Sequence, residues 1–180
     1  MARQLIHTRQ VTCKGYLRDD GLFEVEGHLE DVRGVDCMDK RRVVLVPAGE
    51  TLHGMRLRIT VDEEMRIVEA GARTEHSPHG ECRSAGKAYA ALEGLVIGPG
   101  FLAAARERFR GVQGCTHLTE LVGPVATTAI QTAISAREQQ AGQVEQKGPQ
   151  MSLVDSCVAW RRGGEAFHAH TDEKQEVEQS

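Results

Sequence analysis

The chain of 180 residues lacks long apolar runs, an excess of basic residues and paired cysteines. No apolar run approaches the roughly 18 residues that a membrane-spanning helix needs, and the N-terminus lacks the apolar core of a signal peptide. The formal net charge of −4 argues against a nonspecific binder of nucleic acid or membrane surfaces, because such proteins carry a basic face. We therefore expect a cytoplasmic protein with neither a nucleic-acid nor a membrane partner.

The cysteines are too few and too scattered for a disulfide framework. Their number is odd and no Cys-x-x-Cys pair occurs, which argues against a zinc ribbon or a thioredoxin-type site. The five positions are Cys13, Cys37, Cys82, Cys115 and Cys157. Any metal site must therefore be assembled from segments that are distant in the sequence.

Common catalytic signatures are also absent. The sequence contains no Gly-x-x-x-x-Gly-Lys-Ser/Thr loop and no Gly-x-Ser-x-Gly elbow, and Gly98-Pro99-Gly100 does not follow the dinucleotide pattern. Nucleotide-driven chemistry and standard serine hydrolysis are thus not expected. Four Phe, two Tyr and one Trp allow at most a modest aromatic-lined cavity.

The first half of the chain has the period of β-strands. Residues 23–30 alternate apolar and polar side chains, and they follow a first strand over 5–18 and a turn at Asp19-Asp20-Gly21. Residues 52–62 alternate in the same way, and 65–74 return as a partner strand. Residues 36–42 are expected to form a polar loop before a short apolar run at 43–46. Two hairpins in one antiparallel sheet are predicted.

The second half has helical periodicity. After Ser77-Pro78 the period changes from 2 to 3.6, and one helical stripe contains Cys82, Ala85, Tyr89, Leu92 and Val96. A short second helix is expected near 101–109. A third is expected from about Cys115 to Gln140, kinked or divided by Pro124. These elements predict a single α+β domain over 1–160 whose helices cover one sheet face. Residues 139–150 are expected to be an exposed connection, and 161–180 a polar, mobile tail.

Cys115 and His117 lie at the predicted start of the third helix, after a loop bounded by Gly111 and Gly114. The positive end of a helix dipole favours a thiolate, so Cys115 could be a nucleophile or a metal ligand. His117 could be a second ligand or a base.

His53 has the same strand parity as Met55, Leu57 and Ile59, so we expect it on the apolar face of its strand. A buried imidazole needs a hydrogen-bond partner or a metal ion. Cys82 would also lie at a helix start, although a free cysteine often packs as a small apolar residue.

Together, two thiols and two imidazoles at the ends of elements suit tetrahedral zinc: His53, Cys82, Cys115 and His117. Three protein ligands would make such a site catalytic, and four would make it structural. The alternative is that no cofactor is bound and the same residues act as acids, bases or nucleophile. Near the first turn, Tyr16 and Arg18 could orient a polar substrate group, or Arg18 could form a surface ion pair.

The sequence also resembles a bacterial family of unknown function, often encoded near genes of aromatic-compound catabolism. The resemblance covers about residues 5–160, and Cys115-Thr116-His117-Leu118 is its most specific motif. The other matching segments are Asp20-Gly21, 52–57, 78–82 and 92–95. Gly54 departs from the pattern, since Asp is more often expected there. The architecture further resembles small cofactor-independent lyases that remove formaldehyde from lignin-derived aromatics, an analogy of fold that implies no mechanism.

We therefore expect an enzyme that acts on an aromatic or phenolic metabolite as a lyase or hydrolase, with catalytic residues among His53, His117, Cys115 and Cys82. A non-catalytic metal- or ligand-binding module with a closed Cys/His site is the alternative. A third alternative is an α+β interaction domain with ordinary core cysteines. The expected partner is a small molecule, and the sequence leaves homo-oligomerisation open, through sheet edges or the long third helix.

Overall fold

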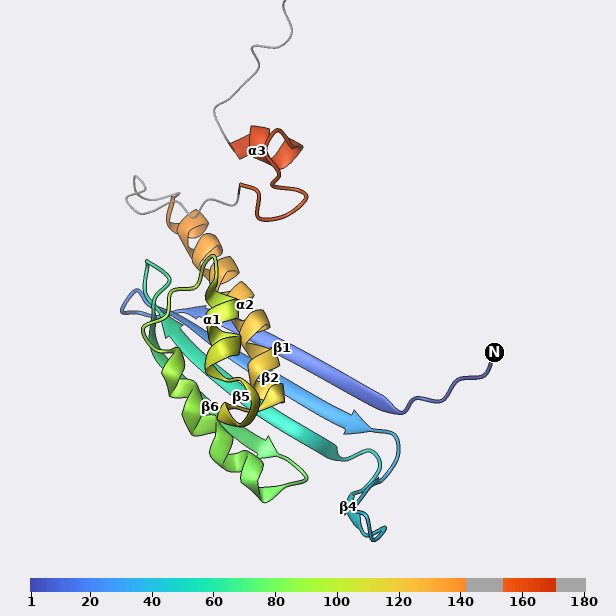
Figure 1. Cartoon of the computed structure of the whole chain (residues 1–180). Helices are drawn as coiled ribbons and strands as arrows, with labels where there is room; N and C mark the ends of the chain where they lie inside the picture. The colour runs from blue at the N-terminus through green and yellow to red at the C-terminus, as the bar shows by residue number, and fades with distance from the viewer. Residues whose placement is uncertain (142–153, 171–180) are drawn as a thin grey trace, which may run out of the picture. The chain divides into compact units, whose positions relative to one another are not determined.

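The computed structural model describes residues 1–141 and 154–170, and it contains a four-stranded antiparallel sheet in the order β1-β2-β5-β6 (Figure 1). The strands are β1 (His7–Leu17), β2 (Phe23–Arg33), β5 (Thr51–Val61) and β6 (Ile67–His76). The two predicted hairpins are confirmed, and they are joined because β2 pairs with β5. The prediction of an exposed connection over 139–150 falls largely outside the described residues, as does that of a tail beyond 170.

The alternation of side chains decides which sheet face is covered. Val25 on β2 lies opposite Ile59 on β5, and both are fully buried. The helices of residues 80–141 lie on this apolar face, and the four strands of the sheet form one layer behind them (Figure 1). The fold is therefore the predicted α+β arrangement, with helices on one side of an antiparallel sheet.

The first helix differs in type from the prediction. Residues Gly80–Leu92 form a 3₁₀ helix, η1, whose buried residues Gly86, Tyr89 and Leu92 are three positions apart. A period of three is that of a 3₁₀ helix, and the sequence stripe at 3.6 matched it only in part. Gly86 also permits close approach to β6, because an added Cβ would lie 2.4 Å from the Ala72 carbonyl oxygen. Val96, expected on the stripe, lies beyond the helix and is 44% exposed.

The remaining helices of this part are α1 (Phe101–Arg108), the short 3₁₀ turn η2 (Gly111–Gln113) and α2 (Thr116–Ala141). Pro124 lies inside α2 and does not divide it, in contrast to the alternative that it separates two helices. α2 packs across β1, β2 and β5. Its approach to β2 requires Gly27, since a Cβ there would lie 2.4 Å from Val125 Cγ2.

Residues 36–42 are not the simple loop that was predicted. Cys37–Met38 (β3) pairs with Val44–Val46 (β4) in a small antiparallel hairpin between β2 and β5. The Asp39 carboxylate accepts hydrogen bonds from the Arg41 and Val43 backbone N–H groups, which closes the turn. The polar residues of this segment therefore form a turn between two very short strands.

The chain divides into two compact units, Met1–Gln146 and Lys147–Ser180. In the second unit, Glu165–His170 forms a short helix, α3, inside the predicted tail, and Phe167 is buried. In the described part of the chain, no helix combines the length and apolar character needed to cross a bilayer.

Candidate functional site

Asp31 is the centre of the candidate site. It continues the inward alternation of β2, and its relative exposure is 0%. Its direct cross-strand neighbours are Arg9 on β1 and His53 on β5. The sheet register therefore brings a carboxylate, a guanidinium and an imidazole together on the helix-covered face.

Arg9 holds both oxygens of this carboxylate. Its Nε donates to Oδ1 at 2.7 Å and its Nη2 to Oδ2 at 2.8 Å, while Nη1 donates to Glu120 on α2. His7 Nε2 lies 3.2 Å from Oδ1. Burial alone would raise the pKa of Asp31, but the hydrogen bonds from Arg9 and His7 outweigh burial and hold that pKa well below its usual value. Asp31 is therefore an anion.

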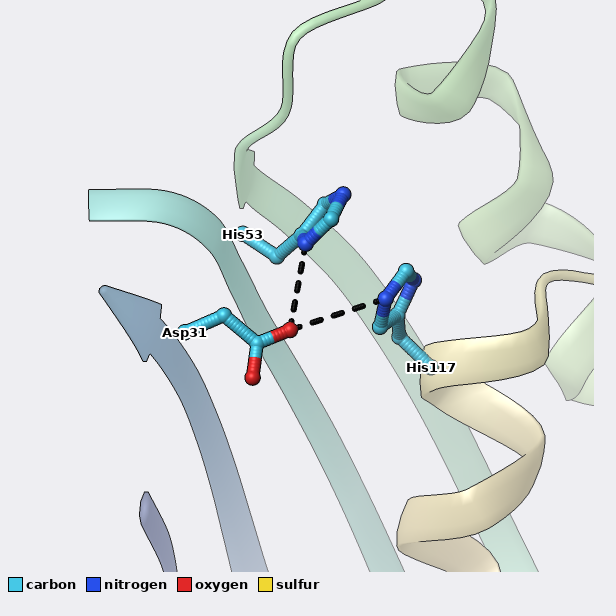
Figure 2. Close-up of side chains that lie close together, drawn as sticks. All are labelled: Asp31, His53 and His117. Carbon is cyan, nitrogen blue, oxygen red and sulfur yellow. Dashed lines mark hydrogen bonds and ion pairs between the residues drawn. The ribbon is translucent and has the colours of Figure 1, made fainter. Parts of the chain in front are cut away.

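Two imidazoles converge on the second oxygen of Asp31 (Figure 2). His53 Nδ1 lies 3.1 Å from Oδ2, and His117 Nε2 lies 3.6 Å from the same atom. The two ring centroids are 3.9 Å apart. The side chains of His53 and His117 are 17% and 23% exposed, so the cluster reaches solvent on its imidazole side.

The surroundings favour a neutral His53. Burial lowers the pKa of its imidazole, against an opposing effect of Asp31. A neutral ring that donates Nδ1–H to Asp31 has its lone pair on Nε2, and Figure 2 shows this nitrogen pointing away from the carboxylate.

Cys115 lies behind His117. Its Sγ is 3.9 Å from His117 Nδ1, the nitrogen that faces away from Asp31. Burial would raise the pKa of this thiol, but His117 and the backbone N–H groups of His117 and Leu118 lower it overall. The start of α2 is fixed by Tyr89, whose hydroxyl accepts the Cys115 N–H and donates to the Cys115 carbonyl oxygen.

Among the described residues, the group with metal-ligand geometry is Asp31, His53 and His117, whose ligand atoms all lie within 4.8 Å of one another. Two members of the expected set, His53 and His117, belong to it. Cys115 touches the remote nitrogen of His117 instead, and Cys82 lies on η1, where its carbonyl oxygen accepts a hydrogen bond from Thr74.

Tyr16 and Arg18 lie far from this cluster. Tyr16 pairs with Glu24 beside the β1–β2 turn, seven residues along β1 from Arg9, which corresponds to roughly 23 Å of strand. Arg18 forms ion pairs with Asp20, Glu24 and Glu69 there. Within one chain, the fold does not bring either residue to His53.

The sequence interpretation gave no role to Asp31, Arg9 or His7. The missing signal was parity, because Asp31 continues the series of Phe23, Val25, Gly27 and Leu29. A charged residue at an inward position demands a partner.

A hollow of about 520 Å³ lies on the opposite, uncovered sheet face between residues such as Lys14, Arg56 and Arg73, away from the cluster.

The fold and the site thus define an α+β protein with an Asp–His–His cluster between sheet and helix. Residues 7–131 match a family described as "Protein of unknown function (DUF2889)", and the chain belongs to this family. The matched range contains every residue of the cluster. Comparison with curated proteins gave no match, and comparison with solved structures gave none either.

Proposed function

We propose that this protein is a small cytoplasmic enzyme that holds a zinc ion at Asp31, His53 and His117 and acts on an aromatic or phenolic metabolite. The observation that carries the proposal is the approach of two imidazole nitrogens, at 3.1 and 3.6 Å, to one oxygen of a buried carboxylate. Imidazole and carboxylate are the ligands that catalytic zinc sites combine.

The spacing of these atoms fits a metal ion. Four-coordinate zinc with bonds of 2.0–2.2 Å separates neighbouring ligand atoms by about 3.4 Å. The distances from Asp31 Oδ2 to the two imidazole nitrogens lie on either side of that value. All three ligand atoms lie within 4.8 Å of one another, so the rings would move closer together around an ion.

The number of ligands supports catalysis over a purely structural role. Three protein ligands leave a position for water or substrate. Cys115 is poorly placed to be the fourth, because its thiol lies at the far nitrogen of His117. It is better placed to orient the His117 ring, as partners of a ligand's second nitrogen commonly do.

Charge also supports a bound cation. Asp31 and Glu120 contribute two negative charges, and Arg9, which contacts both, contributes one positive charge. The surroundings favour a neutral His53, and only a neutral imidazole binds metal. Binding through Nδ1, the nitrogen next to Asp31, would require the tautomer that carries its proton on Nε2. A bound zinc ion would lower the pKa of a coordinated hydroxyl or water molecule.

Two reactions fit this chemistry. A lyase would take the proton from a substrate hydroxymethyl group, break the adjacent carbon–carbon bond, release formaldehyde and return a proton to the carbon left behind. A hydrolase would add water across an ester or related bond. Neither reaction needs an oxidant or reductant. The aromatic substrate class comes from the family resemblance. Tyr16 and Arg18, which were predicted to orient the substrate, have no role within one chain because they lie at the other end of β1.

The first test is the metal content of protein purified without chelator. We expect about one zinc ion per chain in the wild type, and none in His53→Ala or His117→Ala. His28→Ala is the control, since His28 lies on the uncovered sheet face beside Glu75. Cobalt in place of zinc should show no thiolate charge-transfer band. Wild-type protein that takes up no metal would overturn the zinc assignment.

The second test concerns the reaction. Phenolic compounds with a hydroxymethyl side chain are incubated with the metal-loaded protein, and formaldehyde is measured. Aryl esters are tested in parallel for hydrolysis. His53→Ala should abolish turnover while His28→Ala retains it. Turnover that persists in His53→Ala would remove the cluster from the mechanism.

A non-catalytic metal-binding module is the second candidate. The observation that favours it is the low exposure of the three ligand side chains, which is 1% for Asp31, 17% for His53 and 23% for His117. In that case chelation would unfold the protein and no substrate would turn over.

A further inference from the structure

The edge strand β1 has an unused side. Its eleven residues pair with β2 in one continuous register, with no bulge. In the described part of the chain, no backbone hydrogen bond joins β1 to an element on its other side. Unpaired N–H and C=O groups along a long, regular strand form a template for another strand.

The flank beside this edge is suited to close approach. α2 has no charged residue from Val122 to Ala136. A groove between α2 and β1 is lined by small and uncharged side chains that include Thr128, Gln131, Thr132 and Ser135. At the edge itself, the apolar side chains of Ile6, Val11 and Leu17 are each more than 40% exposed. These features are typical of a surface that another chain covers.

We propose that β1 pairs with β1 of a second copy of this chain, in an antiparallel two-fold dimer with one continuous eight-stranded sheet. A two-fold axis makes the same strand self-complementary. Both copies must keep their helix-covered faces on one side, so paired residues have the same parity. Full overlap of His7–Leu17 then places Thr12 opposite Thr12.

This register avoids electrostatic conflict. It places Arg9 opposite Gly15 and Gln10 opposite Lys14, so no two like charges meet across the interface. The Arg9 side chain is turned toward Asp31 and Glu120, so its charge does not oppose pairing of another strand with β1. Each of the two charged residues of β1, Arg9 and Lys14, therefore lies opposite an uncharged residue of the second copy.

The dimer would also complete the surroundings of the site. Antiparallel pairing puts the Tyr16 end of one β1 beside the His7 end of the other. Leu17 of the second copy would lie opposite His7, the histidine that contacts Asp31, on the helix-covered face of the sheet. Tyr16 of the second copy would lie opposite Thr8 on the other face and therefore stays away from the cluster.

The first measurement is the mass of the full-length protein by sedimentation velocity. The chain mass is 19.7 kDa, and we expect twice that value with a concentration-dependent return to the monomer. A wild-type protein that stays monomeric at every concentration tested overturns the proposal. Proline removes one backbone N–H, and neighbouring strand residues direct their N–H groups to opposite sides. Of the N–H groups of Val11 and Thr12, one therefore faces β2 and the other faces the free edge. The proline variant at the position that faces the free edge should keep the wild-type fold and be monomeric.

A charge pair tests the register even if both proline variants fail to fold. Gln10→Glu should lower the dissociation constant of the dimer and Gln10→Lys should raise it, because Lys14 of the second copy lies opposite. Within its own chain Gln10 lies opposite Glu30. In the dilute monomer, Gln10→Glu should therefore lower the melting temperature and Gln10→Lys should raise it. Equal dissociation constants for the two variants, or changes in the same direction, would contradict this interface.

Discussion

Arg9 donates two parallel hydrogen bonds to Asp31, from Nε to Oδ1 at 2.7 Å and from Nη2 to Oδ2 at 2.8 Å. Asp31 is the only fully buried carboxylate in the described ranges, and Arg9 also reaches Glu120 on α2. The pair thus neutralises a charge inside the fold and connects the sheet to the helix that carries His117. A lysine could not reproduce the planar two-point contact.

Replacing Arg9 should destabilise the fold more than replacing another arginine of equal exposure. Arg9→Met leaves the buried Asp31 charge with weaker partners, and we expect a loss of about 2 kcal/mol in the free energy of unfolding, allowing for the partial exposure of Arg9. Arg18→Met is the control, because Arg18 is also 36% exposed and pairs with the exposed Asp20. Urea unfolding measures both, and equal losses would contradict the role assigned to Arg9.

Gly27 should be intolerant of even one methyl group. A Cβ there would lie 2.4 Å from Val125 Cγ2 and 3.2 Å from Leu121, so Gly27→Ala must push α2 away from β2. We expect a loss of about 1–3 kcal/mol. Gly71→Ala on β6 is the matched control, since a Cβ there meets nothing within 4 Å. Thermal unfolding of the two variants decides the matter, and a neutral Gly27→Ala would show that the helix packs less closely.

Tyr89→Phe should loosen the start of α2. The Tyr89 hydroxyl contacts the Cys115 backbone and lies 2.7 Å from Thr119 Oγ1. Removing it leaves the half-buried Cys115 N–H without this acceptor, which costs about 1 kcal/mol. Amide hydrogen exchange should accelerate first in residues 115–119. Leu92→Met is a suitable control, because it changes packing on the same helix without removing a hydrogen bond. Unchanged exchange at the start of α2 in Tyr89→Phe would exclude this role.

Glu75 should give the fold an acid-sensitive contribution. Burial opposes ionisation, but the hydrogen bond from Arg56 and the charge of Arg73 lower the pKa of Glu75 overall. A lowered folded-state pKa means that the contribution is complete above the unfolded value of about 4.3 and is lost as the pH falls through the folded-state pKa. The difference in unfolding free energy between wild type and Glu75→Gln should therefore shrink on acidification, from about 1 kcal/mol or less. A difference that is constant with pH would contradict the assignment.

Much of the fold could be predicted because period and parity are local properties. The alternation in 23–30 and 52–62 identified strands within a few residues, and it placed His53 on the covered face where the structure has it. The helix after Pro78 was predicted with the wrong period, because burial every third residue depends on how Gly86 meets β6.

The site could be predicted only in part. His117 and His53 came from their positions at the start of a helix and on the inner side of a strand. Cys82 was included because any helix start favours a thiolate, a reason that takes no account of distance. Asp31 was within reach of the parity argument, whereas its pairing with Arg9 depends on the register of β1 against β2.

The sequence by itself therefore determined the four long strands, the sheet face that faces the helices and two of the three residues of the candidate metal site, since these follow from spacing along one chain segment. Only the tertiary structure decided that Asp31, His53 and His117 meet and that Cys82, Tyr16 and Arg18 lie apart from them within the chain. The physical reason is that side chains from three elements converge only through strand register and helix docking, which are set by long-range packing.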